Sequence, residues 1–172
     1  MAAAKQDQDI IIHIARNFKN VSVSVPKLKK LVEAVYNRFA RHKAQNRRYE
    51  ISIAIVDDTQ IQELNSQFLN RNATTDCLSF DLSDDEKESE LRNSRILELV
   101  VNGEMAVRQA NLRGHPSEAE LALYITHGLL HNLGFDDSTQ SQARKMHETE
   151  DEILQQFGYG LVYNKGVRTQ EY

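Results

Sequence analysis

The chain of 172 residues, 40% hydrophobic and 27% charged, is long enough for one domain with its own core and too apolar for wholesale disorder. Its single cysteine, Cys77, excludes an internal disulfide framework, and the lack of a signal-like start or of an apolar run of ~18 residues favours a cytoplasmic protein. The net charge of −4 hides an asymmetry, because residues 1–50 carry eleven Lys and Arg against four Asp and Glu, whereas the remainder is strongly acidic.

The first part of the chain alternates strand and helix patterns. The β-branched run at 10–14 predicts a strand, and the alternation at 49–56 predicts a second strand with one buried face. Between them, apolar residues spaced by three and four after the first proline predict an amphipathic helix to about His42. Eight basic residues, opposed only by Glu33, lie within 27–48. Such a run is typical of a solvated helix face or of a phosphate-binding surface.

Further strands and helices follow in the middle of the chain. Asp57 or Asp58 is placed to cap the next helix. The charged run at 83–92 has no apolar period and predicts a loop, and the ends at 1–9 and 161–172 are expected to be loose. The predicted elements are a helix with Ile61, Leu64 and Phe68 on one side, strands at 77–80 and 96–101, and a helix through Met105, Val107 and Leu112.

The order of these elements predicts the fold class. Strands and helices alternate at first, and helices then follow one another to the C-terminus. We therefore expect an α+β fold, a single mixed sheet of about four strands packed by helices, in one domain over 1–172.

The helix with the most distinctive sequence runs over 117–133. Ser117 and Glu120 have the spacing of a capping box at its start, and Gly134 is placed to end it in a left-handed conformation.

This helix carries the residues with metal-binding potential. His127 and His131 are four residues apart, so that both rings project from one face, and Asp137 follows after the turn. Two histidines and a carboxylate leave a fourth tetrahedral position for water, as in catalytic zinc sites. Two partly buried histidines with ordinary hydrogen bonds are the alternative. The glycine stop and the carboxylate behind it favour the metal.

The spacing also fits a zinc protease pattern, with one departure. The glutamate that serves those proteases as general base is replaced here by Gly128. Peptide hydrolysis is therefore the weaker interpretation.

Three blocks of the sequence resemble the YbeY family of metal-dependent endoribonucleases, over roughly residues 10–160. The most specific block is 127–137, His-Gly-Leu-Leu-His-Asn-Leu-Gly-Phe-Asp-Asp. The segment 65–80 is similar to the family's second block, and the helix through Met146, Glu150 and Ile153 is similar to the family's end. The resemblance implies a single α+β domain with zinc at the end of a central helix and the following turn. It also implies cleavage or maturation of ribosomal RNA, notably near the 3′ end of the small-subunit RNA.

Carried over by position, the family's three zinc-ligand histidines fall on His127, His131 and Asp137. The aspartate adds negative charge and makes the metal a weaker Lewis acid. The family's arginine falls on Leu69, and Arg71 is the cation expected to replace it at the phosphate. The family's Gly-Asp pair at the start of the fourth strand is replaced in this sequence by Leu97-Glu98.

The leading hypothesis is therefore a single-strand-specific, zinc-dependent endoribonuclease with one Zn²⁺ per chain. We expect it to act on ribosomal RNA, to work in ribosome quality control, and to meet ribosomal proteins or a ribosome-associated GTPase, without a membrane or a nucleotide cofactor. A non-catalytic ribosome- or RNA-binding relative is the alternative, and a metal-dependent protease-like hydrolase is the third candidate.

Other residues of these types have simpler interpretations. His147 stands among acidic residues on the last helix and is expected to face solvent. His13, His42 and His115 have no partner at ligand spacing, and Cys77 is expected to be a small core residue.

Overall fold

A computed structural model describes residues 9–40, 48–83 and 94–163. The expected loop at 83–92 lies outside these ranges except for Ser83, and so do His42 and most of the expected loose ends. The elements in chain order are β1 (Ile10–Arg16), α1 (Val25–Phe39), β2 (Arg48–Val56), α2 (Asp58–Leu69), β3 (Cys77–Asp81), β4 (Ser94–Asn102), α3 (Gly103–Arg113), α4 (Ser117–Asn132) and α5 (Gln140–Gln156).

The four strands form one mixed sheet in the order β1-β2-β4-β3. β1 pairs with β2 and β2 with β4 in parallel, which requires crossover connections, whereas β3 runs antiparallel to β4 at the edge. The predicted α+β class with a single four-stranded mixed sheet is confirmed.

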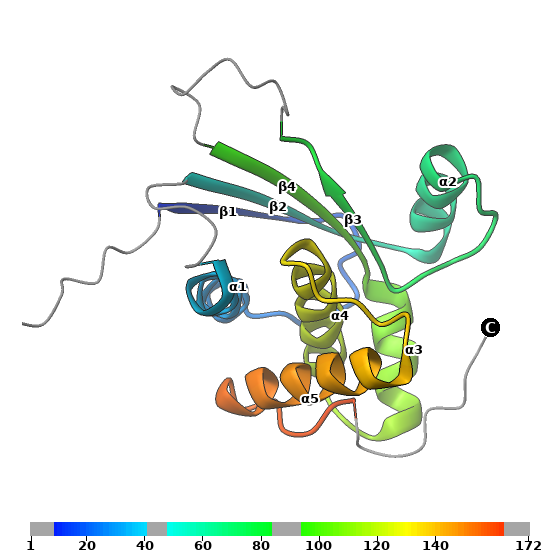
Figure 1. The fold of residues 1–172 in the computed structure, drawn as a ribbon. Helices are drawn as coiled ribbons and strands as arrows, with labels where there is room; N and C mark the ends of the chain where they lie inside the picture. The colour runs from blue at the N-terminus through cyan, green and yellow to red at the C-terminus, as the bar shows by residue number, and fades with distance from the viewer. Residues whose placement is uncertain (1–8, 41–47, 84–93, 164–172) are drawn as a thin grey trace, which may run out of the picture.

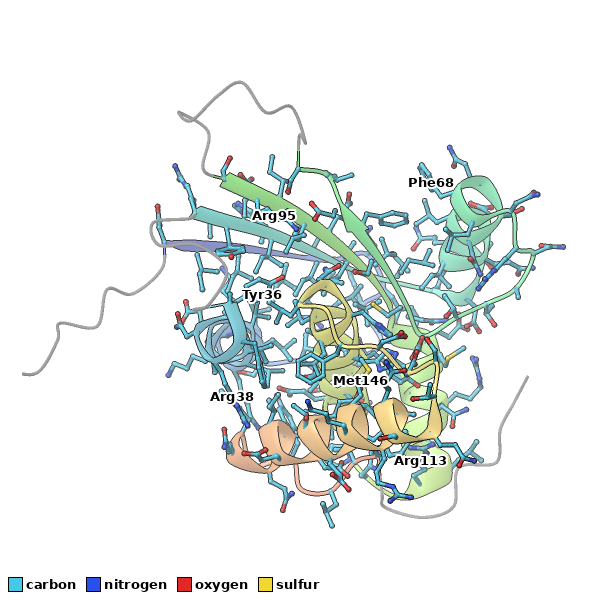
Figure 2. All side chains as sticks on the ribbon, in the orientation of Figure 1. Tyr36, Arg38, Phe68, Arg95, Arg113 and Met146 are labelled. Atoms are coloured by element: carbon cyan, nitrogen blue, oxygen red, sulfur yellow. The ribbon has the colours of Figure 1, made fainter. Side chains whose placement is uncertain are left out.

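Helices cover the two faces of the sheet unequally (Figure 1). α1 and α4 pack on one face, where alternate residues of β2 and β4 form the main core with them. α2 lies on the other face and closes a small cluster of Val56, Ile61, Leu78 and Val100. Phe68 was expected on the same side of α2 as the buried Ile61. It is instead 58% exposed, and its ring packs edge-on against the Phe80 ring with 5.5 Å between centroids (Figure 2).

α4 is the central helix, because the sheet, α1, α3 and α5 all pack against it. Its apolar residues therefore extend around most of its circumference, as expected of a buried helix. Gly128 marks its closest approach to the sheet. A Cβ at this position would lie 2.7 Å from Cys77 Sγ and 2.9 Å from Leu99 Cδ2.

The predicted start of α4 is wrong. The residue that caps the helix is Pro116, and Ser117 is its first helical residue without a side-chain cap. Glu120 is fully buried, and its carboxylate accepts a hydrogen bond from His115 instead of returning to the helix start. The other predicted helix signals are present: Asp57 caps α2 with a capping box, and Gly134 has a φ of 96° just after α4.

The segment after α5 packs, although it was expected to be loose. Val162 is fully buried, and the Tyr163 amide donates a hydrogen bond to Asp151 Oδ1 on α5. The remaining C-terminal residues lie outside the described ranges.

Two basic side chains of α1, Lys27 and Arg38, contact other parts of the chain, whereas two others form no ion pair within the described residues. Lys27 lies 3.8 Å from the centroid of the Tyr159 ring, and Arg38 reaches from α1 to Glu152 near the end of α5 (Figure 2). Lys29 and Lys30 have no ion-pair partner among the described residues. In the same parts of the chain, no helix is both long and apolar enough to cross a membrane.

Candidate metal centre

The two histidines of α4 point their rings at one another. The Nε2 atoms of His127 and His131 are 3.1 Å apart, and the two ring planes are nearly perpendicular. Two ligands on a tetrahedral zinc ion, with bonds of about 2.0–2.1 Å, lie about 3.3 Å apart. The i, i+4 spacing on a regular helix therefore sets the distance that a shared metal ion needs.

A tight turn after α4 brings a carboxylate to the same place. Gly134 takes the left-handed conformation, and the Phe135 amide then donates back to the Leu130 carbonyl. Asp137 Oδ2 lies 3.6 Å from His131 Nε2. One ligand atom each from His127, His131 and Asp137 lies within 4.8 Å of the others, which makes this the one group of three potential metal ligands found in the described part of the chain.

The hydrogen bonds of the two rings show how the group fits a metal. Nδ1 of His127 donates to Glu150 Oε1 at 2.7 Å, and Nδ1 of His131 donates to the Phe135 carbonyl at 3.2 Å. Both acceptors lack protons, so each neutral ring carries its hydrogen on Nδ1 and directs the Nε2 lone pair at its neighbour. Two lone pairs at this separation repel unless a cation or a proton lies between them. The donor set therefore fits a metal ion, with Glu150 and a backbone carbonyl orienting the ligands from behind.

Glu150 is the residue next to the candidate metal group that sequence reasoning missed. Its side chain is fully buried between two histidines, and Oε2 accepts from His147 Nδ1 at 2.8 Å. Burial raises the pKa of Glu150, but the hydrogen bonds from His127 and His147 outweigh it and leave the pKa below the ordinary value. Burial would likewise lower the pKa of His127, but the bond to Glu150 raises it overall. The sequence did contain one signal for a buried Glu150, because this residue stands on the apolar stripe of α5 between Met146 and Ile153.

His147 does not face solvent as expected. Only 19% of its side chain is exposed, its ring stacks on Tyr163 at 3.5 Å between centroids, and it lies parallel to the His127 ring at 6.4 Å. The prediction treated the helix as an isolated charged surface, whereas the chain beyond α5 returns to cover this side.

None of the remaining candidates belongs to the group of three potential ligands. Arg71 follows the left-handed residue Asn70 at the end of α2, is exposed, and forms no side-chain hydrogen bond or ion pair within the described ranges. His13 is exposed on β1, and His115 is bonded to Glu120. Cys77 packs against the main core, and burial raises the pKa of its thiol. The structure thus brings together His127, His131 and Asp137, and within the described residues no contact joins the Arg71 side chain to them.

Comparison with known proteins decides the family. The model of the family described as Endoribonuclease YbeY matches residues 13–158. The chain belongs to this family. An Endoribonuclease YbeY of Macrococcus caseolyticus is 37% identical over 111 residues, which are 63% of this chain and 72% of the relative. One of Staphylococcus aureus is 37% identical over 113 residues, which are 63% and 73% of the two chains.

A solved structure agrees on the fold. The solution structure of TM1509 from Thermotoga maritima superposes with a TM-score of 0.51 and 20% identity, covering 86% of this chain and 89% of that one. The predicted membership of the YbeY family, and with it of an enzyme family whose relatives are named as endoribonucleases, is confirmed.

Proposed function

We propose that the chain is a zinc-dependent, single-strand-specific endoribonuclease that takes part in ribosomal RNA maturation near the 3′ end of the small-subunit RNA. The convergence of His127 Nε2 and His131 Nε2 to 3.1 Å, with both Nδ1 atoms donating to acceptors, is the observation that carries this proposal. Membership of the YbeY family supplies the reaction class.

We assign the following roles in metal binding and catalysis to residues of the chain. His127, His131 and Asp137 would hold one Zn²⁺, which supplies Lewis acidity toward a phosphoryl oxygen and a nucleophile at neutral pH when bound. Glu150 keeps His127 in the tautomer that leaves Nε2 free to ligate. Arg71 is the cation that we assign to the charge developing on the phosphate.

α1 would hold the RNA backbone outside the site. Its C-terminal end adjoins the turn with Asp137, because the Phe39 ring packs on Phe135 at 5.2 Å. Lys29 and Lys30, which form no ion pair with any residue that the structure describes, are the cations that we assign to salt-sensitive, sequence-independent binding of phosphates.

The cellular setting of the proposal follows the family. We propose a cytoplasmic protein that acts on ribosomal RNA in maturation and in ribosome quality control. Ribosomal proteins or a ribosome-associated GTPase would bring it to its substrate.

Metal content tests the proposal first. Elemental mass spectrometry of the purified chain should find about one zinc per chain, none in His131→Ala, and an unchanged amount in the control His13→Ala, whose histidine is exposed on β1. Wild type should then cleave a single-stranded RNA from the 3′ end of the small-subunit precursor, and His131→Ala should not. A wild type that takes up no added zinc contradicts the hydrolytic mechanism.

A non-catalytic RNA- or ribosome-binding relative is the second candidate. It is favoured by Leu69, a half-exposed apolar residue where the family has arginine, and by the aspartate at 137. Asp137→His should raise cleavage if the aspartate only weakens the metal centre, and an inactive variant that still binds RNA would favour this candidate. A protease-like hydrolase has less support, because Gly128 faces Cys77 and Leu99 on the sheet and leaves no room there for a general base.

A further inference from the structure

The end of the described chain is linked to the metal group by three successive contacts. The Tyr163 ring lies on His147 with an angle of 10° between the planes, His147 Nδ1 donates to Glu150 Oε2, and Glu150 Oε1 accepts from His127 Nδ1. Tyr163 lies beyond the family match, which ends at residue 158. Of the residues in this link, Tyr163 alone lies outside the family match.

Glu150 needs both of its histidines. Its side chain has no exposed surface, and a buried carboxylate costs free energy unless hydrogen bonds or opposite charges compensate it. Without His147, Oε2 would lose its donor, and the carboxylate would be free to rotate. Rotation would take Oε1 away from His127 Nδ1, so that His127 would lose the acceptor that fixes its ring.

Tyr163 limits the freedom of His147. The His147 ring is nearly parallel to the Tyr163 ring, with 3.5 Å between centroids, and also to the more distant His127 ring at 6.4 Å. Tyr163 itself is held by its backbone bond to Asp151, and the neighbouring Val162 is fully buried. The segment 161–163 is thus anchored at two points and presents its aromatic ring to His147.

We propose that His147 and Tyr163 are positioning residues of the metal centre, which hold Glu150, and through it His127, in the geometry that binds the metal. The proposal rests on the metal site given under the proposed function. It assigns a role to a histidine that is not itself a ligand and to a segment outside the family match.

The expected effects follow from what each residue contributes. Loss of a residue that orients a metal ligand typically weakens metal affinity about 10–100-fold. We expect a loss near the lower end of that range in His147→Ala. An aromatic stack contributes about 0.5–1.5 kcal/mol, so Tyr163→Ala should weaken affinity by at most about tenfold.

The experiment compares paired variants of the full chain. Zn²⁺ affinity is measured by chelator competition in wild type, His147→Ala, His147→Asn, Tyr163→Ala and Tyr163→Phe. The asparagine retains a donor for Glu150, and the phenylalanine retains the stacked ring. His13→Ala and Phe68→Ala, which remove an exposed histidine and an exposed aromatic far from α5, are the matched controls. Thermal unfolding monitors the fold of each variant.

A second readout needs no metal. In the metal-free protein, the His127 Nδ1 proton in its short bond to Glu150 should give a protected, downfield proton NMR signal. His147→Ala and Tyr163→Ala should broaden or lose it, whereas Tyr163→Phe should keep it.

Two results would overturn the proposal. One is a wild type that binds Zn²⁺ with His147→Ala and Tyr163→Ala binding equally well, which leaves the metal site standing without the positioning role. The other is an unchanged His127 signal in both alanine variants. A wild type that binds no Zn²⁺ contradicts the proposed function instead, and the NMR signal then still decides the positioning role.

Discussion

The protein contains two fully buried glutamates that each accept a hydrogen bond from a histidine at 2.7 Å, Glu120 in the first turn of α4 and Glu150 on α5. In the first pair, His115 uses Nε2, and the buried Nδ1 has no hydrogen-bond partner among the described residues. In the second pair, His127 uses Nδ1 and turns Nε2 toward His131 and Asp137. A buried glutamate bonded to a histidine is thus structural near the start of α4 and part of a candidate metal centre near the end of that helix. The two pairs differ in what the second nitrogen of the histidine ring faces, which is another potential metal ligand only in the case of His127.

The largest expected contrast comes from neutralising each glutamate. Glu150→Gln should weaken Zn²⁺ affinity about 10–100-fold, because an amide can accept from only one of the two histidines. Glu120→Gln should leave the affinity unchanged and lower the free energy of unfolding by about 3–5 kcal/mol, since it disrupts a buried ion pair with Arg113 and weakens the hydrogen bond with His115. Chelator competition and urea unfolding measure the two quantities. Equal effects of both substitutions on affinity would remove the distinction between the pairs.

The position of α4 on the sheet provides an intermediate test. Gly128→Ala places a methyl group against Cys77 and Leu99, and such overpacking typically costs about 1–3 kcal/mol. Because Gly128 adjoins His127, we expect Zn²⁺ affinity to fall with stability. Adding Cys77→Ala should relieve the contact, so that the double variant loses less stability in urea than the sum of the single variants. A fully additive pair would show that the close approach does not constrain the helix.

A part-exposed carboxylate should show the smallest effect. Partial burial raises the pKa of Asp58, but hydrogen bonds from Arg108 and Asn102 outweigh it and leave the pKa below its ordinary value. A lowered pKa in the folded state stabilises the protein above the unfolded pKa of about 3.9 and loses that effect as the pH falls through the folded value. Asp58→Asn should therefore lose less than about 1 kcal/mol at pH 7 and approach wild type below about pH 4. Urea unfolding at both pH values measures this, and a difference that grows in acid would contradict it.

Much of the candidate site could be predicted from local sequence. The positions of His127 and His131 one turn apart, Gly134 at the helix end and Asp137 after it lie within eleven consecutive residues, where helix geometry fixes the spacing. Glu150 lies 23 residues from His127, and its role depends on how α5 crosses α4. His147 was misjudged for the same reason, since its neighbour Tyr163 arrives from beyond the helix.

The sequence by itself determined the order and type of the elements, because apolar spacings of two and of three to four residues distinguish strands from helices. It also determined the pair of histidines and the turn that follows them. Only the tertiary structure decided the strand order β1-β2-β4-β3, the close contact of Gly128 with the sheet, and which buried glutamate orients a metal ligand. These features depend on contacts between segments far apart in the chain. The free energy of such contacts comes from burial and from paired polar groups that no local pattern records.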